Sequence, residues 1–408
     1  MPTIFAAELV DLILSFVHSS PLKCGNGDEN YLDKSTAVLM GRCGLVCRAW
    51  LPSSRRILFY RVQVLQSTAY GFAKLLKKPD RLTFLPFIRE LVLARDLVEH
   101  RWMVSVFPKL VPHLPSTIHL LGYRVRRCRT PENPYTLPCP KLPGITHLDI
   151  SDINEPTLID VVHCVSSFPA LQALRLWVYN WGEMALPVSA PKPPDTLRSL
   201  DLNFGHIGLF LDWIHSSQLP ITSLALFFPD TSFADAPGEI EDPSRYIEGL
   251  GASLTSLKLG FEELWIGDLS KFLEAPFLQK NTQLQALSIQ SSNTKMISLL
   301  RAMHPPPTLK YLTMAMYRLD DADPADKRHA LLVAALNSLL VPLASVKQVK
   351  LVHVYPSDES ETENFKEQML PMCNQWGGRV VETESRDVCS SWFKEGAYWD
   401  PEMYSISK

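Results

Sequence analysis

The sequence predicts an α/β fold: a solenoid of stacked repeats, with parallel strands on its concave face and helices on its convex face, after a short N-terminal helical module. Three observations predict it. A triplet of apolar residues recurs along most of the chain, stretches with helical apolar spacing separate the triplets, and the first part of the chain shows helical spacing alone. At 408 residues the chain is also too long for one ordinary compact core, which favours a repeat array or several domains.

Each triplet has apolar residues at positions i, i+3 and i+5. In a strand, the side chains at i+3 and i+5 point to one face, and those at i+4 and i+6 point to the other. Because one unit alone would leave its apolar face in water, neighbouring units must stack to cover it. The triplets are Ile88-Leu91-Leu93, Ile118-Leu121-Tyr123, Ile145-Leu148-Ile150, Leu171-Leu174-Leu176, Leu197-Leu200-Leu202, Ile221-Leu224-Leu226, Leu254-Leu257-Leu259, Leu284-Leu287-Ile289, Leu309-Leu312-Met314 and Val346-Val349-Leu351.

The triplets return at a nearly regular distance. From the first residue of the first triplet to that of the last, nine steps cover 258 residues, so the mean step is about 28.7. That mean lies at the upper edge of the roughly 20–29 residues of leucine-rich repeats. The Asn or Cys that follows the strand in such repeats is largely missing, although Asn203 lies near that place. We therefore expect a leucine-rich-repeat-like solenoid of about ten irregular units over residues 65–352.

Helices are expected between the triplets. Residues 157–167, 208–216 and 268–274 have helical character, and in the first of these segments the apolar residues follow 3.6-residue spacing. Many of the 32 prolines come just before a triplet, where a proline ends the preceding helix and sets an extended start for the strand. Residues 187–195 and 230–243 are expected to be long loops interrupting the array.

The two ends of the chain differ from the repeats. Residues 353–408 are expected to cap the stack, with a helix over 365–376, a strand over 379–384 and an aromatic tail. Residues 1–64 are predicted to be a helical module, interrupted at 19–35 by a flexible insertion and divided again at Pro52. Helices this short bury too little to be stable alone, so they should pack on a partner or on the solenoid.

Parts of the N-terminal module resemble the F-box of fungal F-box proteins with leucine-rich-repeat-like regions. The similar parts are Phe5 to Leu9 with Ile13, the string LVCRAW at 45–50, and the RxxLFYRV string that follows it. The resemblance covers roughly the first 64 residues; over the repeats it is one of architecture. It implies a substrate-recognition subunit of an SCF-type cullin-RING ubiquitin ligase, which docks to a Skp-type adaptor. By motif match, the adaptor contacts would be Phe5, Leu9, Ile13, Leu45, Val46 and Trp50.

Each of these residues has a plainer alternative, which is core packing within the module or against the first repeat. For Leu12 and Phe59 we favour the core. For Val46 and Trp50 we favour the interface, because a minimal three-helix unit cannot bury every large side chain that it carries. The alternative function is correspondingly a non-enzymatic scaffold or recognition solenoid whose N-terminal helices only cap the array.

A protein substrate is expected on the concave surface, which the i+4 and i+6 side chains form. Trp177 and Phe227 are aromatic at positions where the repeat predicts exposure to solvent, and exposed aromatic residues beside charged ones are typical of contact surfaces. The alternative, which the sequence leaves equally open, is that loops fold over these aromatic residues and bury them. The candidate substrate-binding residues are Arg175, Trp177, Asp201, Asn203, Phe227 and Lys258.

Composition and motifs argue against other classes of function. The net charge of −3 gives no global attraction for nucleic acid or anionic lipid, and no apolar stretch reaches membrane-spanning length. The eight cysteines form neither a disulfide framework nor a zinc site, and Cys43 and Cys47 read as small apolar residues on one helix face. No catalytic or nucleotide-binding motif occurs. We therefore expect a non-enzymatic protein without a cofactor, in the cytoplasm, the nucleus or both.

Overall fold

The computed structural model of the chain describes residues 10, 34–46, 48, 50–78, 82–95, 106–125, 137, 140, 142–154, 156–181, 183, 185–203, 208–228, 243–261, 278–291, 293–317, 334–336, 338–339, 345–354 and 380–386. The chain divides into two compact units. Unit 1 comprises residues 1–124 and 388–408, and unit 2 comprises residues 125–387. Both are built from helices and parallel strands, so the predicted α/β class is confirmed.

Unit 1 begins with a pair of helices and continues into a small sheet. Its strands are hydrogen-bonded in the order of the sequence, and β1 and β2 are parallel. Its described elements are α2 (Lys34–Cys43), α3 (Leu51–Phe59), β1 (Arg61–Leu65), α4 (Gln66–Leu76), η2 (Leu85–Phe87), β2 (Glu90–Arg95), α6 (Phe107–Leu110), η3 (Val111–His113) and β3 (Leu120–Val125).

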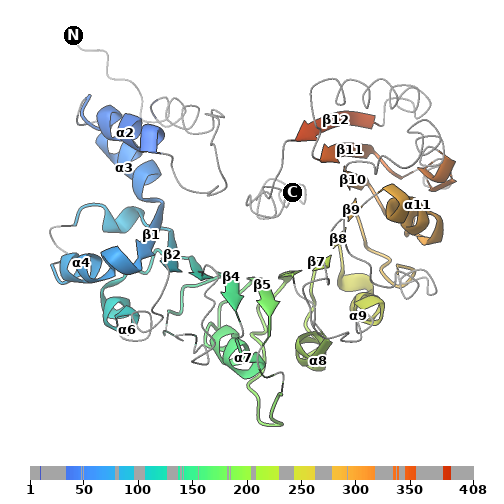
Figure 1. Ribbon diagram of the computed structural model, residues 1–408, viewed down its shortest axis with the longest axis horizontal. Coiled ribbons are helices and arrows are strands. Elements are labelled where there is room, and N and C mark those ends of the chain that lie inside the picture. Colours follow the sequence, from blue (N-terminus) through green and yellow to red (C-terminus); the bar gives the residue numbers. More distant parts are fainter. Residues whose placement is uncertain are drawn as a thin grey trace. The chain divides into compact units, whose positions relative to one another are not determined.

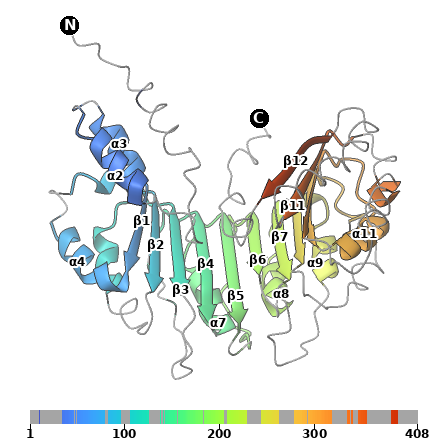
Figure 2. The ribbon, with the colours of Figure 1, turned by 45° about the horizontal axis from the view of Figure 1, so that its top comes forward.

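Unit 2 is a solenoid-like array in which each strand pairs in parallel with the next one in sequence. Its strands are β4 (His147–Asn154), β5 (Ala173–Asn180), β6 (Ser199–Asn203), β7 (Ser223–Phe228), β8 (Ser256–Phe261), β9 (Ala286–Ser291), β10 (Tyr311–Tyr317), β11 (Gln348–Val354) and β12 (Val380–Arg386). Its helices are α7 (Leu158–Ser166), α8 (Gly208–Ser216), α9 (Pro243–Leu250), η5 (Gly251–Ser253) and α11 (Asn293–Ala302). Within this unit the strands follow an arc, with the labelled helices on its outer side (Figures 1 and 2).

The apolar triplets form the core, as predicted. Every triplet residue whose burial the structure describes is at most 3% exposed. In unit 2 the i+3 residues lie opposite one another from strand to strand, in the order Leu148, Leu174, Leu200, Leu224, Leu257, Leu287, Leu312 and Val349. Each of the ten predicted strands begins two residues after the first residue of its triplet. The repeat therefore fixes both the position of the strands and their register.

Two ladders of hydrogen bonds join neighbouring units where the strands begin. In the first, one backbone carbonyl accepts two N–H groups: the Thr146 oxygen accepts from Gln172 (2.8 Å) and Ala173 (3.0 Å), and the same pattern recurs along the array. In the second, a hydroxyl just before a triplet donates to the first triplet carbonyl of the preceding unit. The described donors are Thr117 to Ile88 (2.9 Å), Thr196 to Leu171 (2.7 Å), Ser253 to Ile221 (3.0 Å) and Thr308 to Leu284 (2.9 Å).

The sheet begins earlier than the sequence analysis expected. Phe59, Val62 and Val64 form a further triplet, because Val62 and Val64 lie opposite Leu91 and Leu93. The Tyr60 carbonyl accepts the N–H groups of the next unit, from Arg89 and Glu90 (both 2.9 Å), as in the first ladder. The first strand therefore starts at residue 61, inside the segment assigned to the N-terminal module. The three-part division at residues 64 and 352 stays a prediction.

The other predicted segments can be compared one by one. Helices expected over 157–167 and 208–216 are α7 and α8, the strand expected over 379–384 is β12, and residues 187–195 lie outside helices and strands. Segments 268–274 and 365–376 lie outside the described residues, and of the loop 230–243 only Pro243 is described, at the start of α9.

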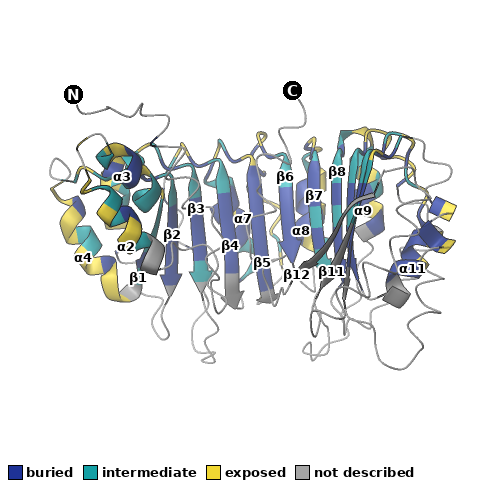
Figure 3. Ribbon diagram, turned by 90° about the horizontal axis from the view of Figure 1, so that it is seen from above, coloured by how far each residue is buried: buried dark blue, intermediate teal, exposed yellow. Residues whose placement is uncertain are grey.

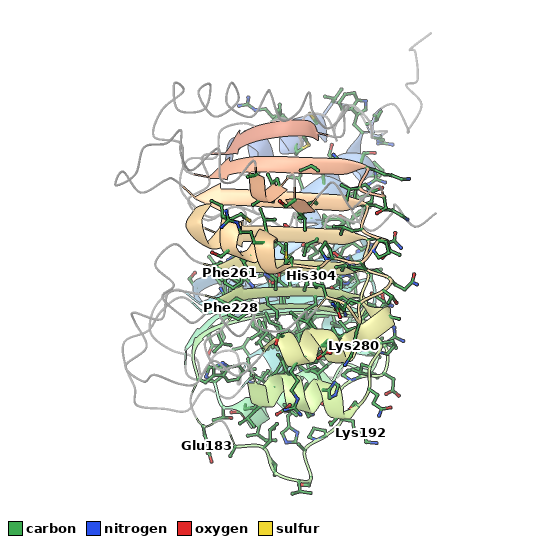
Figure 4. The ribbon with its side chains drawn as sticks, turned by 90° about the vertical axis from the view of Figure 1, so that its right-hand side faces the viewer. Glu183, Lys192, Phe228, Phe261, Lys280 and His304 are labelled. Atoms are coloured by element: carbon green, nitrogen blue, oxygen red, sulfur yellow. The ribbon has the colours of Figure 1, made fainter. Side chains whose placement is uncertain are left out.

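At the far end of β7 and β8, Phe228 and Phe261 stack with ring centroids 5.1 Å apart (Figure 4).

Candidate protein-binding surfaces

Helices α2 and α3 pack with Val10 around a small apolar core. Val10 and Met40 are fully buried, and Trp50, Ile57 and Leu58 pack against them. The thiol-bearing Cys43 is a half-buried member of the same group. Trp50 packs against this core and is half-buried, so part of its indole stays accessible, as the interface predicted for it requires.

The outer side of the same module exposes apolar side chains. Leu45 is 85% exposed and Val46 is 65% exposed, in a turn held by N–H donation to the carbonyls of Arg42 and Cys43 (2.9 and 3.1 Å). Val38 and Leu39 on α2 are also exposed. We call Val38, Leu39, Leu45 and Val46 the α2 patch. Figure 3 marks exposed residues on the helices of this unit in yellow.

The remaining predicted adaptor residues, Phe5, Leu9 and Ile13, lie outside the described residues, as does Leu12. Phe59 stacks on Phe84 with ring centroids 4.7 Å apart, in keeping with the core role expected for it. Among the adaptor residues that the structure describes, Leu45 and Val46 are thus exposed and Trp50 is half-buried.

Three of the predicted substrate residues form one buried network on the sheet face opposite the triplets. Arg175 and Asp201 lie side by side on β5 and β6, with 3.5 Å between Nε and Oδ2. The indole Nε1 of Trp177 donates to Oδ1 of Asp201 (3.3 Å). The Arg175 guanidinium carbon lies 4.2 Å from the centroid of the Trp177 ring, a cation–π arrangement. All three residues are at most 7% exposed.

Burial dominates the electrostatics of this network. Removal from water raises the pKa of Asp201 above its ordinary value, because a buried carboxylate loses its hydration. The Arg175 guanidinium, the hydrogen bond from Trp177 and the more distant Lys258 ammonium oppose that rise, whereas the charge of Asp149 adds to it. Two carboxylates and two cations therefore share this part of the sheet.

These contacts decide between the two alternatives for the aromatic residues. Trp177 is buried, and so is Asn203 at 5% exposure, so the expectation that they present their side chains to solvent is wrong. Phe227 and Lys258 are half-buried and remain accessible in part. The six candidate residues thus divide into a buried set on β5 and β6 and an accessible pair on β7 and β8.

The sequence analysis missed some residues of the same surface. Asp149 and Ser151 on β4 lie opposite Arg175 and Trp177 and are nearly buried. They occupy the i+4 and i+6 positions of the triplet that starts at Ile145, so the repeat itself pointed to them. On the other side of Lys258, the i+4 row continues with Ser288 and Thr313, which are half-buried. We call Phe227, Lys258, Ser288 and Thr313 the sheet-face surface.

Metal sites and membrane-spanning helices are two further features to consider in the part of the chain that the structure describes. No group of three or more His, Cys, Asp or Glu residues there is arranged to hold a metal ion. Within the same residues, no helix has the length and apolar character needed to cross a membrane. His163 and His215 are exposed on α7 and α8, the outer helices on which the sequence analysis placed them.

The comparisons with known proteins assign no family. No family model matches the sequence, and no curated protein matches it. Among solved structures, the chain is similar to a crystal structure of a protein from Bacteroides fragilis, with 13% sequence identity and a TM-score of 0.37. The match covers 79% of this chain and 73% of that one. A likeness this low assigns neither a detailed fold nor a function.

Proposed function

We propose that this protein is the substrate-recognition subunit of an SCF-type cullin-RING ubiquitin ligase. Its N-terminal module docks to a Skp-type adaptor, and its leucine-rich-repeat-like solenoid binds a protein substrate without carrying out chemistry itself. The observation that supports this most is the exposure of Leu45 and Val46, at 85% and 65%, within the string that resembles an F-box.

The α2 patch favours docking over a purely capping role. A cap that only closes the array turns its apolar side chains towards the array and leaves a polar outer face. Here the module buries Met40 in its own core, packs half-buried Trp50 against it, and still leaves four apolar side chains, the α2 patch, at 40% exposure or more. Contiguous exposed apolar side chains mark interaction sites in soluble proteins.

Substrate binding is assigned to the sheet-face surface rather than to the buried network. Phe227 and Lys258 are accessible in part, and they adjoin the hydroxyl-bearing row of Ser288 and Thr313. An aromatic side chain beside a cation and hydroxyl groups offers both apolar contact and hydrogen bonds to a protein segment. Arg175, Trp177, Asp201 and Asn203 then support this surface from the neighbouring strands.

The adaptor contact is tested with the double variant Leu45→Ser/Val46→Ser. The tagged full-length chain should recover a Skp-type adaptor from cells, and the double variant should lose it, because both side chains are exposed and their loss removes only apolar contact. Val188→Ser is the matched control, since Val188 is a fully exposed valine in unit 2. It should recover the adaptor like the parent chain.

Thermal unfolding of the same proteins separates docking from stability. All three should melt at the same temperature, because none of the changed side chains is buried. Recovery of the adaptor by the double variant, or no recovery by the parent chain, would favour the scaffold alternative. Deletion of residues 1–64 is a poorer test, since it also removes most of β1 and exposes β2.

A further inference from the structure

Helix α4, directly after β1, is held in place by its inner face. Ala69 and Leu76, seven positions apart and so on one face of the helix, are fully buried. At the start of the helix, the backbone N–H of Leu65 donates to the Thr68 hydroxyl (3.1 Å), and that hydroxyl donates to the Leu65 carbonyl (3.2 Å). The side chains on the opposite face therefore have defined positions.

That opposite face is apolar and cationic. Tyr70 is 67% exposed and Leu75 is 52% exposed. Lys74 and Lys78 continue the row of Tyr70 at four-residue spacing, while Gly71 lies in the row of Leu75. Apart from its two chain neighbours and the backbone of its own helix, a Cβ atom at Gly71 would meet no atom within 4 Å, so the space above Gly71 is open. We call Tyr70, Gly71, Lys74, Leu75 and Lys78 the α4 face.

The outer helices of unit 2 are different. Within the described residues, the exposed side chains of α7, α9 and α11 are polar, for example His163, Arg245 and Arg301. On α8, Leu209 is exposed to 40%. An outer helix of this chain can thus expose polar side chains alone. The repeat therefore does not require large apolar side chains at Tyr70 and Leu75.

Charge identifies the kind of partner. Residues 34–79 contain nine Lys and Arg and no Asp or Glu, although the whole chain carries a net charge of −3. Among the described residues of unit 1, Glu90 is the one residue with a carboxylate side chain, and this carboxylate lies 3.4 Å from the guanidinium of Arg61. Complementary charge speeds association and excludes partners of like charge. We propose that the α4 face docks an acidic segment of a partner protein, whose apolar residues pack on Tyr70 and Leu75.

A protein fits this face better than a lipid surface does. A helix that lies on a membrane inserts its main apolar face into the lipid. In α4 that face, with Ala69 and Leu76, is already packed inside unit 1. Two separate apolar side chains on either side of an open glycine instead suit the side chains of a partner. This docking surface is independent of the proposed adaptor contact and holds whether or not the adaptor binds.

The test uses the full-length chain and a fluorescein-labelled peptide of glutamate and leucine, followed by fluorescence anisotropy. Binding should be saturable and should weaken with added salt. Lys74→Glu/Lys78→Glu should weaken it by about tenfold or more, since each reversal replaces attraction with repulsion. Tyr70→Ser/Leu75→Ser should weaken it while the salt dependence is retained. A peptide of lysine and leucine should not bind.

Matched controls locate the binding. Lys192→Glu/Lys347→Glu changes two exposed lysines of unit 2 and should leave the affinity unchanged, as should Leu45→Ser/Val46→Ser on the α2 patch. No saturable binding by the parent chain, or equal binding by the Lys74→Glu/Lys78→Glu variant, overturns the proposal. Binding of phosphatidylserine vesicles that depends on the α4 face, without binding of the peptide, would replace the acidic protein with a membrane.

Discussion

Asp201 shows how a single charged residue is held on a sheet face where water is scarce. Its carboxylate receives the Trp177 indole N–H and lies beside the Arg175 guanidinium, yet burial still raises its pKa. Such a group has contact with two partners, and burial nevertheless makes it harder to ionise than a carboxyl in water. The pKa of Asp201 therefore depends on burial and on the side chains around it on the sheet.

The raised pKa of Asp201 predicts a pH dependence of stability. Because the folded value lies above the unfolded value of about 4, the contribution of Asp201 is fully present below the unfolded pKa. It is lost as the pH rises through the folded pKa. The free energy of unfolding of the parent chain, relative to Asp201→Asn, should therefore fall as the pH is raised from about 4 upward. Urea unfolding across this range measures it.

Asp212→Asn is the control for that measurement, because Asp212 is exposed on α8. Its effect on the free energy of unfolding is the baseline for an exposed carboxylate, against which the effect of Asp201→Asn is compared. A parent chain that gains stability relative to Asp201→Asn as the pH rises would show that Arg175 and Lys258 outweigh the burial.

Alanine substitutions at Trp177 and Phe227 should distinguish an effect on stability from an effect on substrate binding. Replacing buried Trp177 with Ala removes a large side chain and the hydrogen bond to Asp201, so we expect a loss of about 3–5 kcal/mol in the free energy of unfolding. Phe227→Ala at the half-buried position should cost less and should weaken substrate binding instead. Urea unfolding of the two variants checks the order. Equal losses would place both aromatic residues in the core.

At the scale of elements, the start of each strand is where the units are joined. A hydroxyl before the triplet, as at Thr196, donates to a carbonyl that lies where the preceding unit turns into its strand. The hydroxyl supplies this carbonyl with a donor from the next unit, and leaving a buried carbonyl unpaired is costly. The hydroxyl ladder therefore strengthens the junction between units rather than the interior of any one unit.

Thr196→Val should remove one rung of that ladder. The Thr196 hydroxyl lies 2.7 Å from the Leu171 carbonyl, and its loss should lower the free energy of unfolding by about 1 kcal/mol. Thr222→Val is the matched control, because the Arg198 carbonyl that Thr222 contacts at 3.3 Å also accepts two backbone N–H groups. Urea unfolding should show a smaller loss for Thr222→Val, and the reverse order would contradict this role for the ladder.

At the scale of the whole molecule, stability in unit 2 is shared between neighbours. Each i+3 leucine is buried and lies opposite the i+3 residues of the adjoining strands. In such an array each unit contacts chiefly the units on either side of it. A defect in one strand should therefore weaken its neighbours first and more distant units less.

Leu200→Ala tests this in the middle of the array. The side chain is 1% exposed, so the loss in the free energy of unfolding should be about 2–5 kcal/mol. Amide hydrogen exchange should speed up in β5, β6 and β7 more than in β10. Leu209→Ala, at a leucine that is 40% exposed on α8, should leave both measurements nearly unchanged. Uniform acceleration over all strands would mean that the array unfolds as one cooperative unit.

The sequence by itself determined the α/β class, the positions of the strands and the register of the array. It did so because apolar side chains at i, i+3 and i+5 must be buried together, and a shift of one residue would turn every one of them to the other face. The further triplet of Phe59, Val62 and Val64 shares this spacing and register, with Val64 buried and the other two half-buried, and it lies within a segment that also resembles an F-box.

Only the tertiary structure decided which candidate residues are accessible. Trp177 and Asp201 occupy positions that point away from the triplets, and Trp50 lies in a helical module too small to bury everything, so alternation and size left their exposure open. The burial of Trp177 and Asp201 and the partial burial of Trp50 follow from contacts with residues distant in sequence, such as Trp177 with Asp201 and Trp50 with Val10 and Met40. Burial of an individual side chain is a property of the assembled neighbours, whereas the periodic pattern is a property of the chain.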